Sequence, residues 1–149
     1  MKNSAEPYAL PGEPERGIAG ILSFWQGLKR HGAEIPFWDD VKISDLPELS
    51  GALALIEVTE RARFRFGVGV VGDDINARYG ADLAGKFLDE LDIRDPLRFL
   101  ISQCSATLEA RKPTYYRYGS PSGDGYARLI APLWGNGRIE MLLAGFAWN

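Results

Sequence analysis

The first apolar pattern along the chain has the spacing of an α-helix. Five side chains lie three or four residues apart and share one helical face: Ile18, Ile21, Leu22, Trp25 and Leu28. This pattern predicts an amphipathic helix over residues 17–31, with basic residues 29–31 in its last turn and Gly32 as a left-handed cap. Residues 1–15, rich in Pro and Glu, are expected to form a flexible tail.

Further along, apolar residues alternate with the two-residue period of β-strands. Five segments have this pattern: 53–58, 64–71, 114–119, 126–134 and 139–148. The polar segment TERAR at 59–63 makes the first two a hairpin, and SPSGDG at 120–125 and Gly135-Asn136-Gly137 join the other three into a meander. The last strand is apolar on both faces, which predicts a central strand covered on both sides.

Three helices are predicted between the hairpin and the meander. Their bounds are 73–80, 82–91 and, for the longest, Asp95 onward, with Asp95 as N-cap and Pro96 at the first helical position. The order of helix, two strands, three helices and three strands predicts an α+β fold with an antiparallel sheet. We expect one domain over residues 16–149, with its core in 50–149.

The composition limits the kinds of partner and functional site that the chain can have. The 149 residues are 46% hydrophobic, enough for one core, and the net charge of −3 argues against a nucleic-acid binder. One Cys and one His can form neither an internal disulfide nor a zinc site with several such ligands. Because neither an apolar signal region nor an apolar run near 18 residues is present, we expect a cytoplasmic protein without membrane association.

Two motifs resemble a catalytic pair and a nucleotide-binding loop, but we interpret both as structural features without such a function. Cys104 and His31 suggest a nucleophile–base pair, but Cys104 belongs to an apolar helical stripe and His31 to a helix end, so we assign no catalytic residue. Gly67-x-Gly69-x-x-Gly72 has the spacing of a dinucleotide loop, but the two aspartates that follow would repel phosphates. We therefore interpret these glycines as packing positions.

Acidic pairs and a basic aromatic run carry weaker signals. Asp39-Asp40, Asp73-Asp74 and the acidic residues within 89–95 lack the spacing of a calcium loop, so we expect helix caps and solvated faces, and no metal site. Cationic residues and tyrosines interleave over 111–118, as in some single-stranded nucleic-acid sites. The acidic total favours packed tyrosines with arginines over them, and no nucleic-acid partner.

The element order and several short motifs resemble PAS domains. Within that superfamily the chain is similar to a bacterial group of stand-alone, single-domain PAS-like proteins, which usually carry a Thr where this chain has Val70. The matching residues are Leu22, Trp25, Leu28, Lys29, Pro36, Trp38, Asp40, Leu46, Pro47, Leu49, Ile56, Glu57, Arg65, Gly69, Tyr79, Gly80, Asp82, Leu83, Gly85, Pro132 and Leu133. The resemblance implies a five-stranded sheet in the order 2-1-5-4-3 with crossover helices on one face.

The same resemblance implies a sensory or regulatory role without a reaction. The module would bind a small, largely apolar ligand, a protein partner or both in bacterial signal transduction. Covalent flavin sensors of the superfamily use a cysteine on an earlier helix, and haem sensors commonly use a histidine on the long helix; this chain has neither. The cofactor therefore stays unknown, with non-covalent flavin open.

The candidate ligand pocket lies between the sheet and the helices of residues 73–110. Its expected lining is Phe66, Val68, Val70, Leu83, Phe87, Leu100, Ile101, Cys104, Tyr116, Leu129 and Leu143. The apolar face of the first helix is the candidate interface: it covers the second face of the sheet either in its own chain or in a homodimer. The alternative function is a small cone-shaped isomerase or dehydratase that uses a pocket carboxylate.

Overall fold

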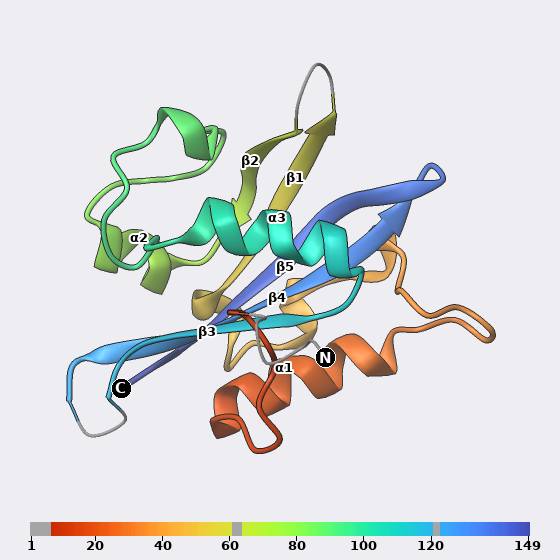
Figure 1. Cartoon of the computed structure of the whole chain (residues 1–149), viewed down its shortest axis with the longest axis horizontal. Helices are drawn as coiled ribbons and strands as arrows, with labels where there is room; N and C mark the ends of the chain where they lie inside the picture. The colour runs from red at the N-terminus through yellow and green to blue at the C-terminus, as the bar shows by residue number, and fades with distance from the viewer. Residues whose placement is uncertain (1–6, 61–63, 121–122) are drawn as a thin grey trace.

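A five-stranded antiparallel sheet forms the centre of the fold (Figure 1). The computed structural model describes residues 7–60, 64–120 and 123–149, so parts of the predicted tail (1–6), of TERAR (61–63) and of SPSGDG (121–122) lie outside the described residues. The strands are β1 Leu53–Glu60, β2 Phe64–Val71, β3 Thr114–Gly119, β4 Gly125–Gly135 and β5 Arg138–Trp148. Their order, β2-β1-β5-β4-β3, confirms the predicted topology and the α+β class.

Helices cover both faces of this sheet. In Figure 1, α1 (Arg16–Gly27) lies on one side, and α2 (Asp73–Tyr79) and α3 (Leu100–Ala110) lie on the other. Short 3-10 turns fill the connections: η2 Trp38–Asp40, η3 Ile43–Asp45, η4 Ser50–Ala52 and η5 Leu88–Glu90. As its two apolar faces predict, β5 is central and pairs with both β1 and β4.

The alternation of side chains along β5 divides the core into two layers. Leu142, Ala144 and Phe146 belong to the layer under α2 and α3. Leu143 belongs to the layer under α1, together with Ala127, Leu129, Ala131 and Leu133 of β4. Each layer is built from every second residue of the same strands, as the pleat requires.

The apolar face of α1 packs on the sheet of its own chain. Ile18, Ile21 and Trp25 are buried there, and the Trp25 indole Nε1 donates a hydrogen bond to the carbonyl oxygen of Pro132 at 2.8 Å. Gly145 permits this approach, because a Cβ at that position would collide with the Ile21 side chain. The candidate interface of the first helix is therefore largely buried in cis, with Leu22 and Leu28 half-buried at its border.

The first helix is shorter than predicted, since it ends at Gly27 rather than at residue 31. The Arg30 side chain turns away and pairs with Asp40 at 2.8 Å, with its guanidinium over the Phe37 ring. These contacts hold residues 28–31 against residues 37–40, so the basic residues do not lie in the last helical turn; His31 is exposed.

The helix predicted over 82–91 is replaced by an extended loop and the single turn η5. Gly85, at φ +80, donates its N–H to the Val68 carbonyl oxygen, and the Val68 N–H donates to the Lys86 carbonyl oxygen. The backbone of 85–86 therefore pairs with the outer side of β2, and its polar groups are not free to form a helix.

The helix predicted from Asp95 onward, α3, begins at Leu100, five residues after its predicted N-cap. The carbonyl oxygens of Pro96 and Arg98, which would accept hydrogen bonds within a helix, instead accept them from the Arg128 side chain. Residues 95–99 therefore form a turn that is held to β4.

Candidate functional site

The interior cavity expected between the sheet and the crossover helices is nearly closed. Its volume is about 20 Å³, room for about one water molecule and far below the roughly 300 Å³ at which pockets for organic ligands begin. Its lining is apolar and contains no carboxylate: Ala54, Ile56, Val68, Val71, Ile75, Leu83, Leu88, Leu97, Leu100, Ala144 and Phe146. In this conformation the layer is a packed core.

Most of the predicted lining residues lie in or beside this layer. Phe66, Val68, Leu83, Leu100 and Cys104 are buried in it. Ile101 and Tyr116 pack against it and are half-buried.

Val70 does not face inward as predicted, since 57% of it is exposed. The pairing of β1 with β2 shifts register: Ile56 lies opposite Val68, but Ala54 lies opposite Val71 instead of Val70. The extra residue reverses the alternation, so Val71 takes the inward position.

Phe87 also lies away from the cavity. Its backbone forms an isolated bridge with Gly67 of β2, and the Arg65 guanidinium lies 3.9 Å from its ring centroid. A Cβ on Gly67 would lie 3.4 Å from the same ring. The phenyl ring therefore covers the other side of β2, and its neighbour Leu88 points into the core.

Leu129 and Leu143 are buried in the layer under α1, on the face opposite the predicted pocket. The pleat places Arg128 and Ile130 of β4, and Leu142 and Ala144 of β5, toward the crossover helices instead. Because both faces of these strands are apolar, the sequence pattern alone does not distinguish the two orientations.

The residue that sequence reasoning missed is Arg128, which is fully buried between β4 and α3. Its guanidinium donates three hydrogen bonds to neutral oxygens: to Gln103 Oε1 at 2.7 Å, to the Pro96 carbonyl at 3.0 Å and to the Arg98 carbonyl at 2.7 Å. The described residues provide no carboxylate ion pair for it. Burial lowers the pKa of Arg128 below its ordinary value. As the one charge within the apolar run YARLIAPLW, Arg128 carried a signal that could have identified it.

A chain of buried polar groups continues from Arg128 to the start of β3. Gln103 Nε2 donates to Thr114 Oγ1 at 3.1 Å, and the hydroxyl oxygens of Thr107 and Thr114 lie 2.7 Å apart. Gln103, Thr107 and Thr114 are all buried. We call Arg128, Gln103, Thr107 and Thr114 the polar network. It joins two strands of the sheet to α3.

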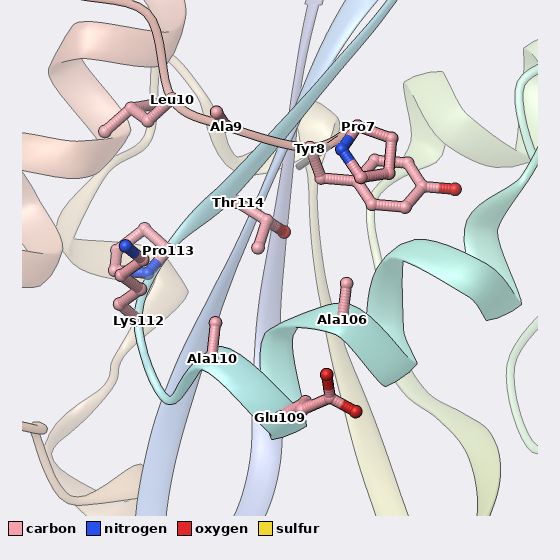
Figure 2. A pocket seen from close by; sticks show the side chains of 10 residues that line it. All are labelled: Pro7, Tyr8, Ala9, Leu10, Ala106, Glu109, Ala110, Lys112, Pro113 and Thr114. Atoms are coloured by element: carbon pink, nitrogen blue, oxygen red, sulfur yellow. The ribbon is translucent and has the colours of Figure 1, made fainter. Parts of the chain in front are cut away.

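The polar network ends at an open groove of about 620 Å³. Figure 2 shows residues 7–10 along one side, α3 along the other, and Thr114 between them. The lining is mostly apolar, with one acidic and one basic side chain at its rim: Pro7, Tyr8, Ala9, Leu10, Ala106, Glu109, Ala110, Lys112, Pro113 and Thr114. This volume falls within the range of small-molecule binding sites.

The wall opposite α3 is formed by residues 7–10, the first part of a segment, residues 7–15, that we call the strap. The Tyr8 carbonyl accepts a hydrogen bond from the Tyr115 N–H of β3 at 2.9 Å, and the Tyr8 hydroxyl donates to Ser102 Oγ of α3 at 2.7 Å. Leu10 packs against the layer under α1. The strap therefore crosses the outer edge of β3 from one face of the sheet to the other.

Glu15 holds the base of the strap. Its carboxylate accepts hydrogen bonds from Tyr115 Oη at 2.8 Å and from Arg117 NH1 at 2.6 Å. Burial raises the pKa of Glu15, but hydrogen bonds from the backbone, Tyr115 and Arg117 and the attraction of Arg117 outweigh it, so the pKa lies below its usual 4.5. Burial, and then the hydrogen bond with Glu15, raise the pKa of Tyr115 to about 12.

A second hollow of about 250 Å³ lies at the end of the sheet. Tyr118, Tyr126 and Trp148 line it with Asp95 and Asp124, and the Arg78 guanidinium lies 4.1 Å from the Trp148 ring centroid. Two of its three rings are thus covered by cations of the chain itself, since Arg98 also lies 4.2 Å from the Tyr118 ring.

The cysteine–histidine pair and the glycine motif considered in the sequence do not form a reactive or nucleotide-binding site. Cys104 is fully buried, which raises the pKa of its thiol to about 12, while His31 is exposed beyond the end of α1. Gly67 and Gly69 belong to a strand that pairs antiparallel with β1, and Gly72 packs against the backbone of Gly51, where a Cβ would collide. The glycine motif thus serves packing.

Comparison of the chain with protein-family models, with curated proteins and with solved structures gives no match. Within the described residues, every helix is too short or too polar to cross a membrane. The function is therefore inferred from the geometry of the groove and of the polar network.

Proposed function

We propose that the chain is a PAS-like sensory or regulatory module of bacterial signal transduction that works in the cytoplasm by binding, without a chemical step. The sheet order β2-β1-β5-β4-β3, with crossover elements on one face, supports this proposal. The binding site is the open groove beside α3, since the interior cavity of about 20 Å³ has no room for an organic ligand.

The observation that carries the proposal is the double role of Thr114. This residue lines the groove, and its hydroxyl also bonds to Gln103 and Thr107 inside the core. An occupant that hydrogen-bonds to Thr114 competes with these partners. Since Gln103 in turn accepts from Arg128, such a change reaches the guanidinium that holds residues 96–98. Occupancy of the groove would then alter the turn at which α3 begins.

The groove favours an occupant that is largely apolar and carries one hydrogen-bonding group. Alanine and proline side chains form much of its surface, and Thr114, whose buried hydroxyl belongs to the polar network, lies at its floor. A small apolar molecule or a protein segment meets this description. Glu109, near the end of α3, and Lys112, just after it, carry opposite charges at the rim, so neither sign dominates.

The test uses Ala106→Trp, which fills the groove from α3 as an occupant would. Hydrogen exchange measured by mass spectrometry should change at residues 95–99 and in β4, as well as beside the substituted residue. The matched control is Ala77→Trp, an equal change at an exposed position of α2. If exchange changes only next to residue 106, the groove is not coupled to the start of α3 and the proposal is wrong.

A further inference from the structure

The residues that the structure describes cover the outer edge of β3 only in part. Hydrogen bonds alternate along an antiparallel strand. Because the Tyr115 N–H points outward to Tyr8, the backbone groups of Arg117 also point outward. No backbone hydrogen bond from the strap or from another described residue outside the sheet reaches the Arg117 amide. One backbone hydrogen bond therefore attaches the strap to a six-residue edge.

The contacts of residues 7–10 resemble those of a docked peptide. They consist of the backbone bond to Tyr115, the Tyr8 hydroxyl on Ser102, the Tyr8 ring 6.4 Å from the Tyr116 ring, and Leu10 on the opposite layer. Backbone pairing supplies affinity in such modes, and anchor side chains supply specificity. Tyr8 and Leu10 are only half-buried, and the groove beside them is open.

Residues 7–10 of the strap can leave without disturbing α1. Glu15 is bound to Tyr115 and Arg117 and also accepts the Ala19 N–H at the start of α1, so residues after 14 are anchored separately. Pro11, Gly12 and Pro14 lie between this anchor and Leu10, and a Cβ on Gly12 would touch nothing within 4 Å. A release of residues 7–10 therefore ends at the Glu15 anchor.

We propose that the β3 edge and the adjoining groove bind an extended segment of a partner protein, and that residues 7–10 are its intramolecular competitor. The partner segment carries a tyrosine-like aromatic hydroxyl and, two residues later, an aliphatic side chain. It pairs with Tyr115 and the outward amide of Arg117, and it places its aromatic group on Ser102 and Tyr116. This inference rests on the proposed function and names its class of occupant.

Fluorescence anisotropy with a labelled synthetic peptide of residues 5–12 of this chain tests the inference. The proteins are the full-length chain and its Tyr8→Ala/Leu10→Ala variant, in which the competitor is weakened. A short tether gives an effective concentration on the order of 1 mM, so for a segment with Kd near ~0.1 mM the wild-type affinity falls about tenfold. The variant should therefore bind about tenfold more tightly than the wild type.

Two controls make the result specific. A peptide with Ala in place of its tyrosine should not bind, and Ser102→Ala combined with Tyr8→Ala/Leu10→Ala should weaken binding of the intact peptide. Circular dichroism verifies that each variant is folded. Equal binding by wild type and Tyr8→Ala/Leu10→Ala, or no binding by either folded protein, overturns the inference.

Hydrogen exchange separates this inference from the proposed function. Peptide binding that leaves residues 95–99 unchanged supports the docking edge but contradicts the coupling through Thr114. Conversely, if Ala106→Trp alters residues 95–99 while the peptide binds neither protein, the proposed function stands and the peptide inference is wrong.

Discussion

Arg128 is a buried cation whose partners are all neutral. A guanidinium loses hydration when it enters a core, and its hydrogen bonds must replace that loss. Gln103 Oε1 and the carbonyls of Pro96 and Arg98 supply three acceptors, and the Tyr116 ring centroid lies 4.9 Å from the guanidinium carbon. The planar guanidinium, with donors pointing in several directions, thus connects β4 to both α3 and the turn before it, which a lysine ammonium group would not do.

We expect Arg128→Met to lower the free energy of unfolding by about 2 kcal/mol, because buried acceptors would lose their donors. The cost is moderate because the substitution also removes a buried charge. Urea denaturation measures the change, and hydrogen exchange should become faster at residues 95–99. Arg128→Lys should recover less than half of the loss, since its ammonium cannot reach all three oxygens in fork geometry. Unchanged stability with unchanged exchange would contradict this role.

At the residue scale, the layer of a candidate pocket residue was predicted correctly where its strand or helix has one apolar face, and incorrectly where both faces are apolar or a bulge intervenes. Phe66, Val68, Leu100 and Cys104 occupy the predicted layer because β2 and α3 each have one apolar face there, and Leu83 lies in it although the helix predicted around it does not form. Leu129 and Leu143 lie in the other layer because their strands are apolar on both faces, and Val70 faces solvent because a register shift in β1–β2 reverses the alternation. Neither a choice between two apolar faces nor a bulge is visible in the spacing of side chains.

At the scale of elements, two segments that were predicted to be helical are not, because their backbone groups form hydrogen bonds with other parts of the fold. Residues 82–91 have helical spacing, but the backbone of 85–86 pairs with Val68. Asp95 and Pro96 form a plausible helix start, but Arg128 takes the carbonyls of the following turn. The strands were predicted to within two residues because hairpin turns and alternation act locally. The groove could not be predicted, since the strap that forms one wall has no periodic pattern.

The strap should detach from its base as the pH falls. The pKa of Glu15 in the folded protein lies below 4.5, so its carboxylate contributes stability above that pH. This contribution is lost as the pH falls below 4.5 and through the folded pKa. Protection of the Tyr115 amide against hydrogen exchange, corrected for intrinsic rate, should be high at pH 6 and should decline as the pH falls below 4.5.

Glu15→Gln should show low protection of the Tyr115 amide already at pH 6, with little further change on acidification. Glu13→Gln is the matched control, because Glu13 is exposed and should leave the wild-type profile unchanged. The same decline in wild type and Glu15→Gln would assign the pH dependence to another carboxylate.

At the scale of the whole molecule, the sheet is a partition between two separately filled cores. Trp25 closes one of them from its own chain, so we expect Trp25→Glu to lower the free energy of unfolding by about 4 kcal/mol through lost packing and a buried charge. Light scattering of the remaining folded protein should give the wild-type mass. Gln26→Glu adds the same charge at the exposed neighbouring position and should have little effect. A lower mass with unchanged stability would place the Trp25 face in a subunit interface instead.

The two margins of the sheet are protected by different means. Residues 85–86 and the bridge at Phe87 cover β2, whereas the strap covers β3 through one backbone bond. An uncovered strand edge is a template for pairing between copies and hence for aggregation. β3 carries three tyrosines, and Arg117 is its one charged residue. In a chain whose strap is displaced, binding of a partner segment therefore competes with self-association along β3. By covering this edge, the strap also protects the protein against aggregation.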